Sequence, residues 1–128
     1  MSIDYQTLNL EQLFLTAFEG MGFQFTHPAL ITDNPIADSR LSYVLTHQNS
    51  QNELIGVIIR DWKRNVGVGQ VHKAEELLQA CPKLTKIIII SCMGFSYSAK
   101  RLADQTTVIS LISRGELISF LLNRFEFL

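Results

Sequence analysis

Cysteine and histidine are scarce in this sequence, which has two cysteines and three histidines among 128 residues. Cys81 and Cys92 are too far apart for a CxxC pair, and the histidines lie in different predicted elements, at His27, His47 and His72. A structural zinc site needs several such side chains at short spacing. The sequence therefore provides no zinc-site or CxxC pattern, and the default location for so few cysteines is the reducing cytoplasm.

Long apolar runs are also missing. The longest, Ile87 to Ile90, has the length of a strand and falls far short of the roughly 18 residues of a membrane span. The first residues lack a basic start followed by an apolar block, so no secretory signal is expected. Apolar residues nevertheless make up 47% of the chain, which favours a folded protein over disorder. The length fits one domain, expected over residues 1–128.

The chain has no strong excess of either charge, since its net charge is −1. The two signs are nevertheless unevenly distributed: residues 1–59 contain one base and six acids, whereas residues 60–101 contain eight bases and three acids. Such asymmetry permits a basic patch on a nearly neutral protein. On charge alone, ordinary solvated side chains explain the pattern equally well.

Hydrophobic periodicity predicts an α/β fold. Helical spacing of apolar residues predicts helices over residues 9–21, 71–80, 97–103 and from Ser113 to Leu122. Alternating or continuous apolar residues predict strands over 23–26, 41–46, 54–62, 86–91 and 107–111. Prolines and aspartates predict a loop over 28–39, and residues 47–52 form a polar turn. The order α-β-β-β-α-β-α-β-α implies a mixed sheet of about five strands with helices on both faces.

The predicted third strand ends in Asp61-Trp62-Lys63. Because side chains alternate along a strand, Asp61 and Lys63 are expected on one face and Trp62 on the other. A carboxylate can hold a divalent cation, and a neighbouring lysine can position water or offset developing charge. The triplet is therefore consistent with metal-assisted phosphodiester hydrolysis. A surface ion pair at a strand end would give the same pattern, and the triplet alone favours that simpler interpretation.

A cation site requires further carboxylates. Asp38 precedes the predicted second strand and is the first choice for a second ligand, with Asp33 as a competitor. A third acid could come from the first predicted helix, at Glu11 or Glu19.

The order of elements, together with the triplet, resembles the PD-(D/E)xK nuclease superfamily, and more narrowly its Mrr-like restriction endonuclease branch. The resemblance covers roughly residues 9–122. The segment around Glu11, followed by Gly22-Phe23, is similar to the opening helix of the family. Ile36-Ala37-Asp38 resembles its Gly-Ile-Asp before the second strand. Arg60-Asp61-Trp62-Lys63-Arg64 resembles the end of its third strand, Gln/Glu-x-Lys-Arg, and Gly94-Phe95-Ser96 resembles a later turn.

The resemblance implies a restriction-endonuclease-like fold and an Mg²⁺-dependent or Mn²⁺-dependent endodeoxyribonuclease. By this resemblance Asp38 and Asp61 would bind the metal, Lys63 would be the catalytic lysine and Glu11 an auxiliary acid. The DNA backbone would be held by nearby basic residues, namely Arg60, Arg64, Lys73, Lys100 and Arg101.

A second hypothesis is a nuclease-fold module that has lost catalysis and binds DNA or a protein partner. It is motivated by the missing Gly-Ile before Asp38 and by the weakly acidic net charge of the chain. A further departure from the family pattern is Asp61, which stands where this branch usually has glutamine or glutamate. The apolar final helix, Leu117 to Leu122, could also support a homodimer.

Overall fold

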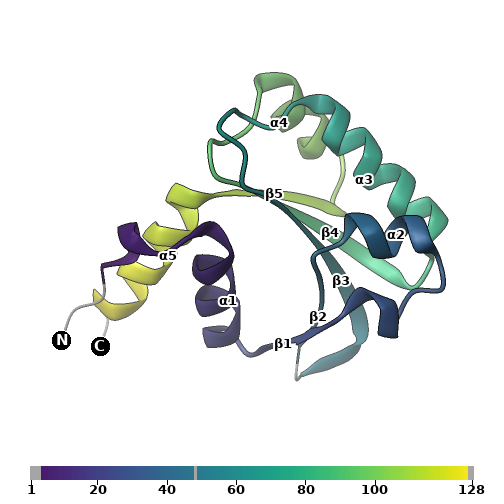
Figure 1. Cartoon of the computed structure of the whole chain (residues 1–128), viewed down its shortest axis with the longest axis horizontal. Helices are drawn as coiled ribbons and strands as arrows, with labels where there is room; N and C mark the ends of the chain where they lie inside the picture. The colour runs from purple at the N-terminus through teal and green to yellow at the C-terminus, as the bar shows by residue number, and fades with distance from the viewer. Residues whose placement is uncertain (1–3, 48, 127–128) are drawn as a thin grey trace.

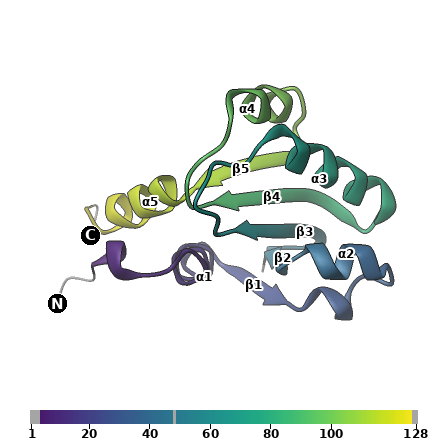
Figure 2. The same ribbon diagram turned by 45° about the horizontal axis from the view of Figure 1, so that its top comes forward.

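The computed structural model describes residues 4–47 and 49–126, which contain one five-stranded sheet (Figure 1). Its strands lie in chain order: β1 (Phe23–Thr26), β2 (Tyr43–His47), β3 (Ser50–Arg60), β4 (Leu84–Ser91) and β5 (Ile109–Ser113). The first three pair antiparallel, whereas β3, β4 and β5 run parallel and point the same way in Figure 2. The expected mixed sheet is confirmed.

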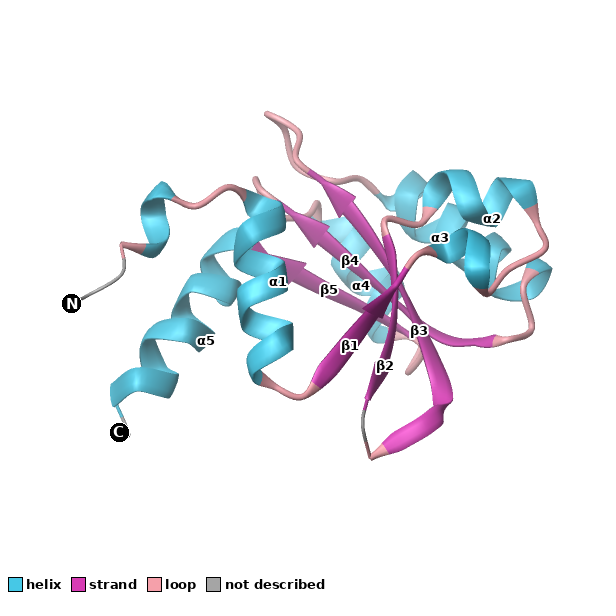
Figure 3. Ribbon diagram, turned by 60° about the horizontal axis from the view of Figure 1, so that its bottom comes forward, coloured by secondary structure: helices cyan, strands magenta, loops and turns pink. Residues whose placement is uncertain are grey.

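Helices cover both faces of this sheet (Figure 3). One face carries α1 (Leu10–Gly20) and α5 (Arg114–Glu126), which contact each other. The other face carries α2 (Pro35–Arg40), α3 (Val68–Ala80) and α4 (Tyr97–Asp104). Two short 3-10 helices, Tyr5–Thr7 and Pro28–Leu30, complete the described elements. The architecture is the restriction-endonuclease-like α/β fold that the resemblance implies.

The core is split by the sheet into two apolar clusters. In β4, Ile87 and Ile89 pack toward α3 and α4, whereas Ile88 and Ile90 pack toward α1 and α5. All four are buried. A strand that is covered on both faces needs apolar residues at every position, which explains its unbroken apolar run.

Several predicted helix ends are confirmed by their hydrogen bonds. Asn9 and Gln12 form a capping box at the start of α1, and Ser96 caps α4. Ser113 and Glu116 exchange hydrogen bonds at the start of α5. These side chains bind backbone N–H groups that have no partner inside the helix.

Two predictions about element boundaries are wrong in places that bear on the site, and smaller shifts occur in α3, which begins at Val68 rather than Val71, and in β5, which covers Ile109–Ser113 rather than 107–111. Residues 28–39 are not a plain loop, because they contain a 3-10 helix and most of α2, which is capped by Asn34 with Pro35 in its first turn. In addition, β3 begins at Ser50 inside the expected polar turn and ends at Arg60 rather than Trp62. Asp61 and Lys63 therefore lie beyond the strand, and its alternation does not place them on one face. Among the described helices, none is long and apolar enough to span a membrane.

Candidate functional site

The carboxyl ends of β3, β4 and β5 meet at one edge of the sheet because these strands are parallel. Asp61-Trp62-Lys63-Arg64 follows β3, Cys92 follows β4 and Arg114 follows β5. In sheets of this kind, ligands commonly bind outside the carboxyl ends of the strands. This edge is therefore the candidate site.

Asp61 is exposed, and its carboxylate faces the Cys92 thiol. Burial raises the pKa of Cys92 above its usual value, and the hydrogen bond and charge of Asp61 raise it further. Cys92 packs against the core beneath α1 and α5. Asp61 thus lies toward the α1 and α5 face of the sheet.

Trp62 lies toward the opposite face, packed against the core beneath α3 and α4. The guanidinium carbons of Arg60 and Arg64 lie 5.5 and 4.6 Å from the centroid of its ring. Lys63 is exposed and lines an open hollow together with Trp62 and Arg64. Lys63 therefore belongs, with Arg60 and Arg64, to a basic cluster around Trp62. Among the described residues it forms no ion pair with Asp61.

Asp38 lies in the first turn of α2, where its carboxylate accepts a hydrogen bond from the hydroxyl of Thr32. Thr32 is buried, with 3% of its surface exposed. The residue immediately before β2 is Ser42, whose Oγ accepts a 3.3 Å hydrogen bond from the backbone N–H of Ile59. A hydroxyl, rather than a carboxylate, thus stands beside the last part of β3.

Glu11 lies in the first turn of α1 and accepts a hydrogen bond from the Tyr43 hydroxyl on β2. This hydrogen bond, with burial and the charge of Glu11, raises the pKa of Tyr43 to about 12. The remaining alternatives from the sequence, Asp33 and Glu19, are both exposed.

The acids predicted from the sequence do not gather into one cluster. Mg²⁺ and Mn²⁺ prefer carboxylate oxygens, with waters and substrate phosphates completing the shell. Within residues 4–47 and 49–126, no group of three or more His, Cys, Asp or Glu side chains could hold a metal ion. Glu11 and Asp38 accept hydrogen bonds from hydroxyls on other segments, and of the three predicted acids Asp61 is the one that directly follows β3.

The other predicted DNA contacts lie on the helices of one face. Lys73 is exposed on α3, and Lys100 and Arg101 are exposed on α4, which packs beside α3 (Figure 1). Together with Arg60 and Arg64 they place positive charge on the α3 and α4 side of the sheet.

Sequence reasoning did not find Thr32 and Tyr43, which donate to Asp38 and Glu11, or Ser42, which stands beside the end of β3. Tyr43 lies 32 positions from Glu11 along the chain. No local pattern links two such residues. The Thr32 hydrogen bond depends on α2, a helix that the sequence did not predict.

The mixed sheet, the flanking helices and the Asp-x-Lys triplet after the third strand define a restriction-endonuclease-like domain. The chain belongs to the restriction endonuclease family: the model of the Mrr-like catalytic domain matches residues 4–121. This match confirms the predicted superfamily and its Mrr-like branch. A search of the curated proteins finds no match.

Proposed function

We propose that this domain binds DNA through the phosphate backbone, at the carboxyl end of β3. The observation that carries the proposal is the grouping of Arg60, Lys63 and Arg64 around Trp62 in a chain of the restriction endonuclease family. None of these three cations forms an ion pair in the described part of the chain. Cations without acidic partners are available to phosphate oxygens.

Metal-dependent cleavage is the finer form of this proposal. It is supported by family membership and by the presence of Asp61 and Lys63 after β3. In this form Asp61, with Asp38, would bind Mg²⁺ or Mn²⁺, Lys63 would act at the scissile phosphate and Glu11 would assist.

A second form, binding without cleavage, is supported by the arrangement of the side chains. Asp38 and Glu11 are engaged by Thr32 and Tyr43, and Ser42 supplies no charge beside the end of β3. Within the described residues, no three acids, cysteines or histidines are gathered into a group that could hold a metal ion. We therefore favour DNA binding without cleavage as the function of this domain.

The test combines gel retardation with plasmid nicking in Mg²⁺ or Mn²⁺. We expect retardation of DNA at low salt, no nicking, and retardation that is unchanged in Asp61→Ala. Nicking that is lost in chelator and in Lys63→Ala would establish the endonuclease instead. Lys86→Ala, which removes the same charge near the amino end of β4, is the matched control.

Absence of retardation at low salt would contradict DNA binding and leave a protein partner as the remaining form of the hypothesis. A homodimer, a requirement for Mg²⁺ and a cytoplasmic location stay predictions from the sequence. Sedimentation of the purified protein tests the first of these directly.

A further inference from the structure

We propose that Arg60, Trp62 and Arg64 form a preorganised subsite for one phosphodiester group, on the face of the sheet opposite Asp61. This inference rests on the proposed DNA binding and deepens it, because it assigns one backbone phosphate to a defined set of side chains. It also separates the phosphate-binding surface from the acidic residue of the triplet.

Trp62 is held in place beside the two arginines. Its ring packs against the core beneath α3 and α4, which limits its motion. The guanidinium groups of Arg60 and Arg64 lie 5.5 and 4.6 Å from its centroid. Stacking on an aromatic face orients a guanidinium while its N–H groups remain available at the edge. A planar fork of this kind matches two oxygens of a phosphate.

Arg60 lies in a partly buried environment close to another cation, Arg40. The Arg60 guanidinium is half-buried and donates from Nε to the Gln70 side chain at 3.2 Å, in the first turn of α3. Burial lowers the pKa of Arg60, and the positive charge of Arg40 lowers it further. A partly desolvated cation beside another cation is unfavourable, and a bound anion would relieve both effects.

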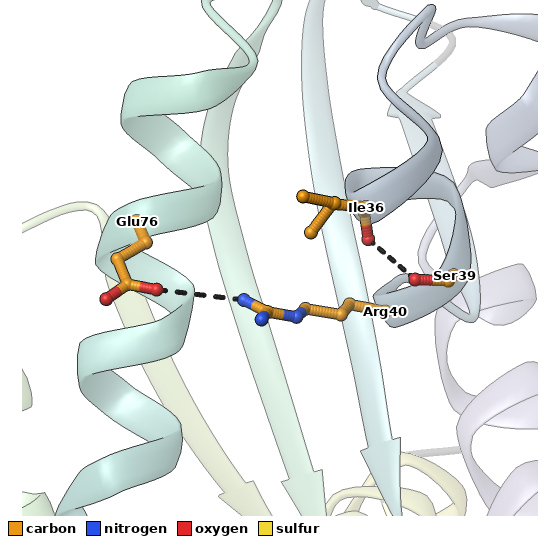
Figure 4. Close-up of polar contacts among 4 residues, drawn as sticks. All are labelled: Ile36, Ser39, Arg40 and Glu76. Carbon is orange, nitrogen blue, oxygen red and sulfur yellow. Dashed lines mark hydrogen bonds and ion pairs between the residues drawn. The ribbon is translucent and has the colours of Figure 1, made fainter.

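No acidic side chain within the described residues supplies that anion to Arg60. Arg40 extends from α2 toward Glu76 of α3, as Figure 4 shows, at 3.8 Å. The Glu76 side chain is 70% exposed, so water weakens this ion pair. Arg40 therefore has only a weakly held acidic partner, and its charge still acts on Arg60.

The surface beside Trp62 and Arg64 is open to an approaching ligand. Trp62, Lys63 and Arg64 line an open hollow at the protein surface. Nearby, α3 begins after Gly67 without a side-chain cap, and apart from the adjoining chain no described residue lies within 4 Å of where a Cβ would stand at Gly67 or Gly69. A nucleic acid backbone can thus approach the arginines, with the first turn of α3 adding partial positive charge.

The experiment uses Trp62 as a local reporter, because it is the single tryptophan of the chain. The intact protein is titrated with a short DNA duplex while tryptophan emission is recorded. Anisotropy of a labelled duplex gives the affinity independently. We expect the emission to change in parallel with binding. The double variant Arg60→Gln/Arg64→Gln should bind about tenfold or more weakly, since each lost contact is a charge-assisted hydrogen bond.

Lys83→Gln/Lys86→Gln is the matched control, because it removes two positive charges near the opposite end of β4. It should change the affinity by no more than about twofold, the effect of screened distant charge. Arg64→Gln alone guards against misfolding of the double variant, since Arg64 is exposed. Its affinity should fall and its thermal unfolding should match the native chain.

The outcomes separate the two proposals. If the duplex binds the native chain and the arginine variants equally, with constant Trp62 emission, the subsite is wrong and DNA binding stands. If the control pair weakens binding as much as the arginine pair, the effect is only net charge and the subsite is again wrong. If no duplex binds at low salt, both proposals are wrong.

Discussion

The three candidate carboxylates differ in what each one contacts. Glu11 accepts from a tyrosine hydroxyl, Asp38 accepts from a buried threonine hydroxyl, and Asp61 faces the Cys92 thiol. Metal-binding carboxylates are commonly hydrogen-bonded themselves, so these contacts fix the orientation of each acid. The identity of the three acids therefore does not by itself predict the site. Their neighbours determine where each carboxylate points.

The contact between Glu11 and Tyr43 predicts an unusual titration. The pKa of Tyr43 is about 12, whereas an unfolded tyrosine titrates near 10. The contact between Tyr43 and Glu11 contributes stability that is fully present below about pH 10 and is lost as pH rises through about 12. The reason is that Tyr43 loses its hydroxyl proton at lower pH in the unfolded chain than in the folded one. Ultraviolet absorbance of the native chain minus that of Tyr43→Phe isolates the transition. Glu11→Ala should move it toward lower pH, and a native transition already near 10 would contradict the contact.

The contact between Asp61 and Cys92 is testable without any assay of activity. Because burial and then Asp61 raise the pKa of Cys92, Asp61→Asn should lower it and expose more thiolate. Alkylation of Cys92 at mildly alkaline pH should become severalfold faster, as followed by peptide mass spectrometry. Lys63→Gln is the control and should leave the rate unchanged. Equal rates in the native chain and Asp61→Asn would show that Asp61 does not face Cys92.

At the scale of elements, local sequence patterns predict most of the helices and strands. The capping pairs Asn9–Gln12 and Ser113–Glu116 and the apolar run of β4 follow from residues close together in sequence. The six-residue helix α2 was missed, because its apolar periodicity is too short to recognise beside Pro28 and Pro35. The end of β3 at Arg60 was also missed, since its limits depend on pairing with β2 and β4 rather than on its own residues.

The capping box of α1 gives a prediction for stability. Asn9→Ala removes the side-chain acceptor for the backbone N–H of Gln12, so unfolding free energy should fall by about 1 kcal/mol. Urea denaturation measures the change. Thr16→Ala is the control: Thr16 is exposed within the same helix, and alanine favours helix, so stability should change by only a few tenths of a kcal/mol. Equal losses in both variants would show that the cap contributes nothing of its own.

At the scale of the whole molecule, the uneven charge of the sequence has a spatial counterpart. The basic segment, residues 60–101, includes the end of β3 and the helices α3 and α4, which lie together on one face. The acidic first part is divided between the faces, since α1 lies on the other face whereas α2, with Asp38, packs beside α3. The sequence supplied the charge of each segment, but only the fold shows that the basic residues of β3, α3 and α4 share a side.

This arrangement predicts how DNA affinity depends on salt. If Arg60, Arg64, Lys73, Lys100 and Arg101 each neutralise one phosphate, the logarithm of the association constant should fall with the logarithm of salt with a slope of about −4.5. Arg60→Gln/Arg64→Gln should make the slope shallower by about 1.8, because two phosphate contacts are lost. Anisotropy of a labelled duplex over a range of salt concentrations measures both slopes, with Lys83→Gln/Lys86→Gln as the control. A slope near zero would mean that the affinity does not come from phosphate contacts, and an unchanged slope in the arginine variant would place those contacts on α3 and α4 alone.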